Sequence, residues 1–363
     1  MLKLFFVVLL IIHGLIHLMG FVKSFGFAKI EQLNSFISKS FGLIWLITAL
    51  IFLFAAVLFL FGDKRWLFLG LVSIIFSQTL IFFYWEDAKF GTIPNVLILI
   101  MVVVGFALWH FDLKIDRETD KVLSKQIQSN KIIIDEKIKK LPEAIQKWVR
   151  NSGIIGKKMV NTVFLKQRGY MRLKPEQKKW IKTEALQYFS INQPAFIWKV
   201  KMTVLGLPIV GRDLFMDGKG GMLIKIAGII PVVNIMNNKK IDISTIQRYL
   251  GEIVWFPSAV ISSYIKWEEV DKHIVKGTMR YGDNRGSAFF HFNEKWEITK
   301  VIAYRYKEIE DKQPKKWVAE VKKTEKINGV KIPIELEVSW ILKNKKFTWY
   351  KFKIYDVIYN KNK

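Results

Sequence analysis

The sequence predicts a membrane-spanning α-helical domain, a four-helix bundle, followed by an α+β domain: a curved antiparallel β-sheet wrapped on a helix. Three observations lead to this fold class. Residues 1–111 hold 7 Lys/Arg and 4 Asp/Glu, whereas residues 112–363 hold 50 and 27, so an apolar block precedes a very basic one. Four long uncharged runs fill the first block. In the second block, apolar residues recur at every second position, the period of a half-buried strand.

Each of the four apolar runs approaches the ~20 residues that a helix needs to cross a bilayer. None of them contains Lys, Arg, Asp or Glu, and the segments that join runs two to four are short. No small-x-small cleavage site follows the first run, so we expect a retained helix rather than a signal peptide. The runs are Leu4–Phe21, Phe41–Phe61, Trp66–Tyr84 and Pro94–Phe111.

Four spans place both ends of the bundle on one side of the membrane. Near the span ends, that side carries seven basic residues and the opposite side carries four. Basic residues are enriched in cytoplasmic loops. We therefore expect a multi-pass protein of the cell membrane whose C-terminal domain faces the cytoplasm.

Polar residues from three spans are predicted to meet near mid-bilayer. His13 and His17 are four residues apart and share one helix face. Counting 1.5 Å of rise per residue from the span ends places Thr48, Ser77 and Gln78 at the same depth. The matching window of the fourth span, Ile98–Val102, is wholly apolar.

This intramembrane layer has several interpretations. Neutral histidines can hydrogen-bond across helices and fix the packing. Ionisable residues at this depth also mark proton or quinone sites, and a haem or metal site is a third option. Haem is the weakest of these because no second axial histidine lies at the right depth: His110 is at the far end of the fourth span. We predict no cofactor and no metal.

The basic block divides into a linker and a domain. Residues 112–140 carry fourteen charged side chains without Gly or Pro, which predicts a charged helical linker, with Asp116–Lys140 as a polar helix or tether. A short helix is expected from Leu141 to Arg150. The basic β-sheet domain then occupies 141–363.

Alternation predicts the strands of this domain. It is clearest in Phe196–Met202 and Ile334–Leu342. Ser244 and Gln247 form a capping-box pattern, which predicts a helix that begins there and ends before Pro257. Strand-like runs also occur at 163–173, 179–189, 272–279, 287–292, 299–306, 317–323 and 347–359. Hairpin loops are expected at 218–221 and 282–286.

Several segments of the domain resemble a family of bacterial proteins that has no assigned activity. The clearest are Arg168–Leu173 (RGYMRL), Arg248–Glu252 (RYLGE) and Trp255–Pro257 (WFP). The resemblance covers roughly residues 140–360 and not the apolar runs. It implies a fold similar to the lipoprotein-carrier half-barrel, an incomplete barrel wrapped on a helix that holds acyl chains. It implies no functional residues.

The leading functional hypothesis is a membrane-anchored binding module for a lipid or another hydrophobic ligand. Trp198, Trp255 and Trp340 are candidate pocket residues, and ordinary core packing is the alternative for each. Arg212 and Asp213 are either a ligand-orienting pair or a buried ion pair. The net charge of +23 after residue 111 favours an anionic membrane lipid as a partner over nucleic acid, because Lys and Arg are spread over nearly every strand.

Two other functional classes remain open. One is a membrane enzyme, or a redox or quinone-interacting subunit, that uses His13 and His17. The other is a non-catalytic scaffold or sensor. No catalytic residue is predicted, since zinc-hydrolase, Gly-x-Ser-x-Gly and phosphate-loop motifs are absent. With no cysteine, the chain has no disulfide, thiol nucleophile or Cys-ligated metal. The oligomeric state stays open.

Overall fold

The computed structural model describes residues 2–124 and 131–360. It divides into two compact units, Met1–Asp112 and Leu113–Lys363. We describe each unit separately.

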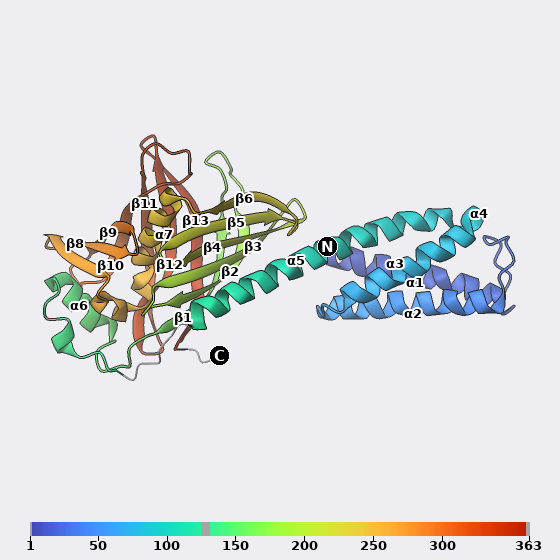
Figure 1. The fold of residues 1–363 in the computed structure, drawn as a ribbon, viewed down its shortest axis with the longest axis horizontal. Helices are drawn as coiled ribbons and strands as arrows, with labels where there is room; N and C mark the ends of the chain where they lie inside the picture. Colours follow the sequence, from blue (N-terminus) through green and yellow to red (C-terminus); the bar gives the residue numbers. More distant parts are fainter. Residues whose placement is uncertain (1, 125–130, 361–363) are drawn as a thin grey trace. The chain divides into compact units, whose positions relative to one another are not determined.

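The first unit is a bundle of four apolar helices, each long and apolar enough to cross a membrane (Figure 1). These helices are α1 (Leu2–Ser24), α2 (Lys39–Phe61), α3 (Trp66–Phe83) and α5 (Thr92–Ser124). Two short turns, α4 (Trp85–Ala88) and η1 (Lys89–Gly91), join α3 to α5. The multi-pass prediction is confirmed at this level.

The ends of α2 show how local sequence sets a helix boundary. The Ser38 hydroxyl accepts a hydrogen bond from the backbone N–H of Phe41 and caps the first turn. Gly62 ends the helix in the left-handed conformation, which a residue without Cβ adopts easily. Large apolar side chains such as Phe54 and Leu50 stay exposed on its outer face, as expected of a helix that faces lipid.

Helix α5 is longer than the apolar run that predicts it. It continues through charged sequence to Ser124, and its part from Leu113 onward belongs to the second unit. The polar helix expected over Asp116–Lys140 is therefore helical up to Ser124. Residues 125–130 lie outside the described part, and only a single 3-10 turn, η2 (Asp135–Lys137), follows before α6 (Glu143–Ser152).

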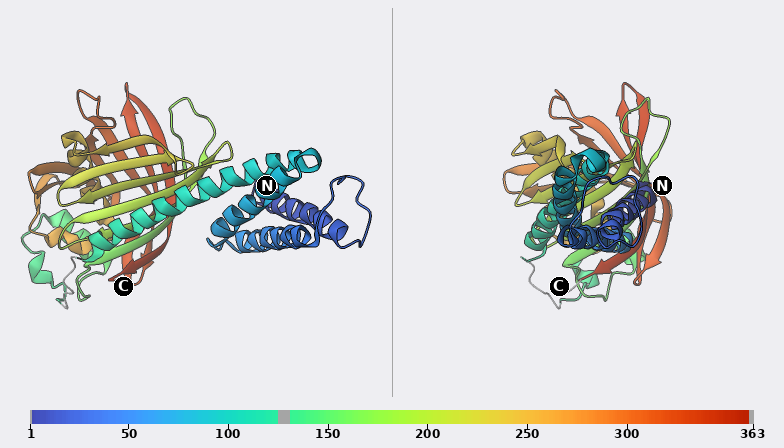
Figure 2. Two further views of the ribbon diagram at one scale, coloured as in Figure 1. Left: turned by 45° about the vertical axis from the view of Figure 1, so that its right-hand side comes forward. Right: turned by 90° about the vertical axis from the view of Figure 1, so that its right-hand side faces the viewer.

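The second unit is built on one antiparallel sheet of thirteen strands, strongly curved and not closed (Figure 2). Its order is β6-β5-β4-β3-β2-β1-β13-β12-β11-β10-β9-β8-β7, so β6 and β7 are the edges. The predicted fold class is confirmed. The strands are β1 (Thr162–Met171), β2 (Ile181–Ser190), β3 (Ala195–Val204), β4 (Leu207–Met216), β5 (Lys219–Ile226), β6 (Ile230–Met236), β7 (Ile265–Asp271), β8 (Ile274–Tyr281), β9 (Asn284–Phe292), β10 (Ile298–Arg305), β11 (Lys315–Ile327), β12 (Val330–Leu342) and β13 (Lys345–Tyr359).

The sheet curves around α7 (Lys239–Glu252), which contacts β4, β5, β8, β9 and β10. Ile246, Tyr249 and Leu250 of this helix are fully buried in the main core. Gly220 of β5 makes the close approach possible, because a Cβ there would lie 2.3 Å from the Thr245 hydroxyl oxygen. Two 3-10 turns, η3 (Ile253–Trp255) and η4 (Pro257–Ile261), follow α7.

The predicted start of this helix is wrong. It begins at Lys239, where the Asn238 side chain accepts from the backbone N–H of Lys240. Ser244 lies inside the helix and donates to the backbone oxygen of Tyr306 instead of capping. A serine that hydrogen-bonds a neighbouring segment of the chain produces the same sequence pattern as a serine that caps a helix.

Two edge elements were not predicted as strands. In β6 nearly every side chain is exposed, so no apolar alternation marks it, and in β7 only Ile265 and Trp267 are buried. The glycine-rich segment 218–221 is a turn only at Gly218, since β5 begins at Lys219.

Candidate functional site

The concave side of the sheet holds a cavity of about 300 Å³ beside α7. Its wall comes from β1–β5, from β10–β13 and from one side of α7. The wall is mostly apolar and aromatic. Its large side chains are Met171, Trp198, Met202, Met222, Trp255, Trp317, Leu336, Val338, Trp340, Phe347, Trp349, Tyr350 and Phe352.

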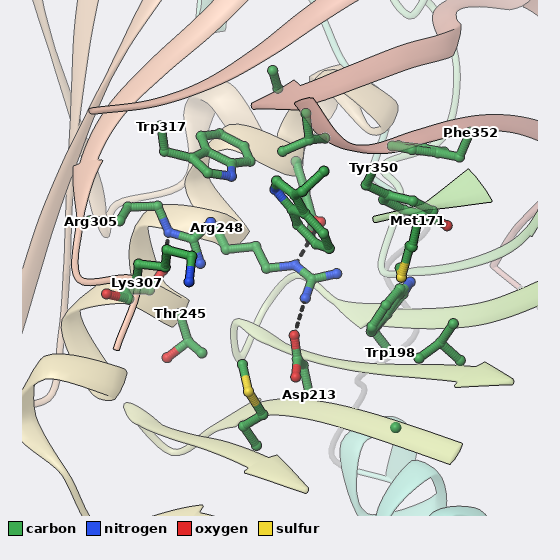
Figure 3. Close-up of a pocket in the computed structure, with 18 of the residues that line it drawn as sticks. Met171, Trp198, Asp213, Thr245, Arg248, Arg305, Lys307, Trp317, Tyr350 and Phe352 are labelled. Atoms are coloured by element: carbon green, nitrogen blue, oxygen red, sulfur yellow. Dashed lines mark hydrogen bonds and ion pairs between the residues drawn. The ribbon is translucent and has the colours of Figure 1, made fainter. Parts of the chain in front are cut away.

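Charged and aromatic side chains divide the cavity (Figure 3). Arg305 and Lys307 lie on one side, and Met171, Trp198 and Tyr350 lie on the other. The ion pair between Arg248 and Asp213 stands between the two sides.

Arg248 is held from both ends of its guanidinium. Its Nη1 pairs with the carboxylate of Asp213 on β4, and its Nε donates to Glu252 Oε1 at 2.9 Å, one turn later in α7. The guanidinium also lies over the rings of Phe196 and Trp198, at 5.0 and 4.9 Å from their centroids. A buried arginine paired with two carboxylates is a fixed part of the wall.

From Glu252 a chain of hydrogen bonds crosses the floor of the sheet. Gln187 Nε2 donates to Glu252 Oε2 at 2.8 Å, and Gln167 Nε2 donates to Gln187 Oε1 at 2.9 Å. Gln167 Oε1 then accepts from Trp198 Nε1 and from the Tyr350 hydroxyl. Each polar side-chain atom in this series of hydrogen bonds has a partner, so the network fixes the orientation of the aromatic wall.

Burial shifts the ionisation of this cluster. It raises the pKa of Asp213 and of Glu252 above the ordinary carboxyl values, although the positive charge of Arg248 opposes the rise. Burial lowers the pKa of Arg248, but Glu252 and Asp213 outweigh it, so the net pKa of Arg248 is raised. Burial, together with the nearby Arg248, lowers the pKa of Arg305 to about 10.

All five candidate ligand residues lie in the wall of this cavity, but the carboxylate partner of Arg212 lies outside it. Trp198, Trp255 and Trp340 line it and are almost fully buried, and Asp213 pairs with Arg248 in it. Whether they bind a ligand stays a prediction.

Arg212 has a different partner. Successive side chains of a strand point to opposite faces of the sheet, so the Arg212 guanidinium points away from the Asp213 carboxylate. Its Nε lies 2.9 Å from Glu118 Oε2 of α5, and its side chain is only 3% exposed. Arg212 and Asp213 therefore do not form a pair with each other. Arg212 instead connects β4 to α5.

Several wall residues were missed or undervalued by sequence reasoning. Arg248 and Glu252 were noted only as the ends of the RYLGE segment, and Arg305 was not predicted as a site residue. Gln167 and Gln187 did carry a signal: each occupies an inward position of an alternating strand, beside buried Leu165 and Phe189. A polar residue at an inward position indicates a buried network.

The intramembrane layer forms a directed hydrogen-bond network in the first unit. His17 Nε2 lies 2.9 Å from Ser77 Oγ, and His13 Nε2 lies 2.9 Å from Asn95 Oδ1. Asn95 Nδ2 donates to Ser77 Oγ and to Gln78 Oε1. His17 Nδ1 lies 2.8 Å from the backbone oxygen of His13, which assigns it the proton. Two neutral imidazoles satisfy this pattern.

Two expectations about the layer need correction. Thr48 is buried at this level, but its hydroxyl donates to the backbone oxygen of Ile44 in its own helix and does not join the network. The fourth span contributes Asn95, not only apolar side chains, because it starts at Thr92 and its first turns reach the histidines. The residue count started at Phe111, the end of the apolar run, and did not reach Asn95; Phe111 is not a helix end, since α5 extends to Ser124.

A model of a family of unknown function, DUF6920, matches residues 139–359. This range covers the whole sheet from β1 to β13 and none of the four apolar helices. No curated protein matches the chain.

Proposed function

Since the chain belongs to DUF6920, a family of unknown function, we propose its function from the site: a membrane-anchored protein whose curved sheet holds a lipid or another hydrophobic ligand. The single observation that carries the proposal is the aromatic-walled cavity beside α7.

The size and lining of this cavity support binding of a small apolar molecule. Ligand sites are typically clefts of about 300–1,000 Å³, lined by apolar side chains with a few fixed polar groups. The cavity, at about 300 Å³, has this character. Its serine and threonine hydroxyls donate to backbone oxygens, Thr245 to Ile241 O and Ser244 to Tyr306 O, and the Tyr350 hydroxyl donates to Gln167 Oε1. The wall is thus suited to holding a ligand rather than to attacking one.

An acyl chain is the ligand class that we favour. The unclosed sheet around α7 supports the expected similarity to the lipoprotein-carrier half-barrel. Rings such as Trp198, Tyr350 and Phe352 offer a long apolar surface on one side of the cavity.

We also propose that an anionic membrane surface is a partner, and that the turn between β3 and β4 contacts it. Leu205 at the tip is 99% exposed, and its φ of 50° is one that a leucine rarely adopts. The neighbouring β5–β6 turn exposes Ile229 and Ile230, and the two turns are joined by a hydrogen bond from Ala227 N to Pro208 O. Apolar tips on a very basic domain suit a bilayer with anionic lipids.

The cell membrane and its cytoplasmic face are the location that we propose. The support is the excess of basic residues on the terminal side of the bundle, seven against four.

A pair of equal substitutions tests the binding function. Met222→Trp places a bulky indole ring in the cavity wall, whereas Met236→Trp makes the same change at an exposed position of the edge strand β6. Lipid is extracted from each purified full-length protein and quantified by mass spectrometry. We expect an apolar ligand at near-stoichiometric amounts in the wild type and in Met236→Trp, and a severalfold loss in Met222→Trp. Equal amounts in both variants would contradict the proposal.

A further inference from the structure

Four arginines line the cavity, and Arg305 differs from Arg212 and Arg248 in having no carboxylate partner. It is the last residue of β10, and its side chain lines the cavity. Its Nε donates to the backbone oxygen of Ser244 at 3.0 Å. In the described ranges, Arg305 forms no ion pair, and no oxygen accepts from its two Nη groups.

The carboxylates of the cavity are already committed. Both Asp213 and Glu252 bind Arg248, and Glu252 also accepts from Gln187. They act on Arg305 only at a distance, and Arg248 opposes them with its own positive charge. The wall holds four arginines and one lysine but only two carboxylates, and its geometry leaves Arg305 without a direct counter-charge.

Aromatic rings compensate only in part for the missing counter-charge of Arg305. The Arg305 guanidinium lies 4.9 Å from the centroid of Trp317 and 5.9 Å from that of Trp340. Such contacts stabilise a cation but accept no hydrogen bond in the plane of the guanidinium. A guanidinium offers a fork of N–H groups that matches two oxygens of a carboxylate or a phosphate. Arg305 has this fork free beside an apolar space.

We propose that the ligand of this cavity is a single-chain amphiphile with an anionic head, a carboxylate or a phosphate monoester, whose head binds the Nη groups of Arg305. The chain lies along Trp198, Tyr350 and Phe352 on the other side of the cavity. A volume of about 300 Å³, at the low end for ligand sites, suits one chain better than two. This inference rests on the proposed function and names its ligand class.

The test is a competition experiment on the full-length protein in nanodiscs. A long-chain alcohol that carries a photoreactive diazirine labels the cavity, and three unreactive competitors of equal chain length displace it: a fatty acid, a monoalkyl phosphate and an alcohol. The variants are Arg305→Gln, Arg305→Lys and, as a matched control, Arg168→Gln. Arg168 is 63% exposed and lies outside the cavity wall.

We expect the anions to displace the probe from the wild type at about tenfold lower concentration than the alcohol. Arg305→Gln abolishes the preference for anions but is still labelled by the probe. Arg305→Lys keeps part of the preference, and Arg168→Gln keeps all of it. The anion that competes better identifies the head group as carboxylate or phosphate.

The two levels of the proposal fail differently. If acid, phosphate and alcohol displace the probe equally from the wild type, the anion site is refuted while the apolar cavity function stands. If the probe does not label the second unit at all, the proposed function fails and the anion site fails with it.

Discussion

At the residue scale, aromatic and ionised side chains differ in how well sequence identifies their role. Trp198 and Trp340 could be placed on an inward strand face from alternation alone, and both are buried at the cavity. The partner of a charged residue could not be found in this way. Asp213 pairs with Arg248 and Arg212 with Glu118, at separations of 35 and 94 residues. Only the curvature of the sheet and the path of α5 bring these groups together.

The first prediction concerns the paired arginine of the cavity. Arg248→Leu leaves the largely buried carboxylates of Asp213 and Glu252 without their cation, so we expect a loss of up to about 3 kcal/mol in the free energy of unfolding at pH 8. Burial already raises both carboxyl pKa values, and removal of Arg248 raises them further. The folded variant then binds more protons than its unfolded chain, so its stability falls as pH rises above the ordinary carboxyl values and recovers towards pH 5.

Denaturant unfolding of the purified chain, followed at pH 5 and pH 8, measures this effect. The control is Arg168→Leu, which removes an exposed arginine 3.7 Å from Glu184 and should change stability by less than about 1 kcal/mol. A loss for Arg248→Leu that is the same at both pH values would show that lost packing, not uncompensated charge, causes it.

The second prediction concerns the membrane layer. If His17 fixes helix packing, His17→Gln keeps a polar partner for Ser77, whereas His17→Leu removes it. We expect His17→Leu to destabilise the bundle by about 0.5–2 kcal/mol and His17→Gln to stay close to the wild type. Unfolding of detergent-solubilised protein by a denaturing detergent measures both. A leucine variant as stable as the wild type would remove the structural role and favour a chemical one.

At the element scale, strands and helices were predictable where one face is buried and the other is wet. This holds for β3 and β12, whereas the four apolar helices were predictable from their long uncharged runs. It fails for β6, which exposes both faces at the sheet edge, and for the start of α7, where Ser244 bonds a strand instead of a cap. The exposure of a turn residue such as Leu205 cannot be predicted from hydrophobic periodicity, because its exposure and its positive φ arise from the hairpin geometry.

The third prediction concerns that turn. The chain has no cysteine, so Leu205→Cys gives a unique labelling site for an environment-sensitive fluorophore. In liposomes that contain anionic lipid and nitroxide-labelled lipid, we expect strong quenching at position 205. The control is Val270→Cys on β7, which is also an exposed apolar position, at 53%. Equal quenching at the two positions would argue against membrane contact by the β3–β4 turn.

At the scale of the whole molecule, the sequence separates the two units because their compositions differ so strongly. The apolar block and the basic block correspond to Met1–Asp112 and Leu113–Lys363. The separate linker expected over 112–140 does not stand out, since its described helical part is counted with the sheet unit and Glu118 binds Arg212 there. Some residues of the cavity wall could be predicted from sequence, but the place and size of the cavity could not, because it arises where β1–β5, β10–β13 and α7 fail to fill the space between them.

The central claim is that this cavity holds an apolar ligand. The most direct measurement is photolabelling of the full-length protein in nanodiscs with a diazirine-bearing long-chain alcohol, followed by mapping of the labelled residues. The account predicts labels at cavity residues, including Trp198, Trp340 and Tyr350, and their loss in Met222→Trp but not in Met236→Trp. Labels confined to the lipid-facing side chains of the four apolar helices would contradict it.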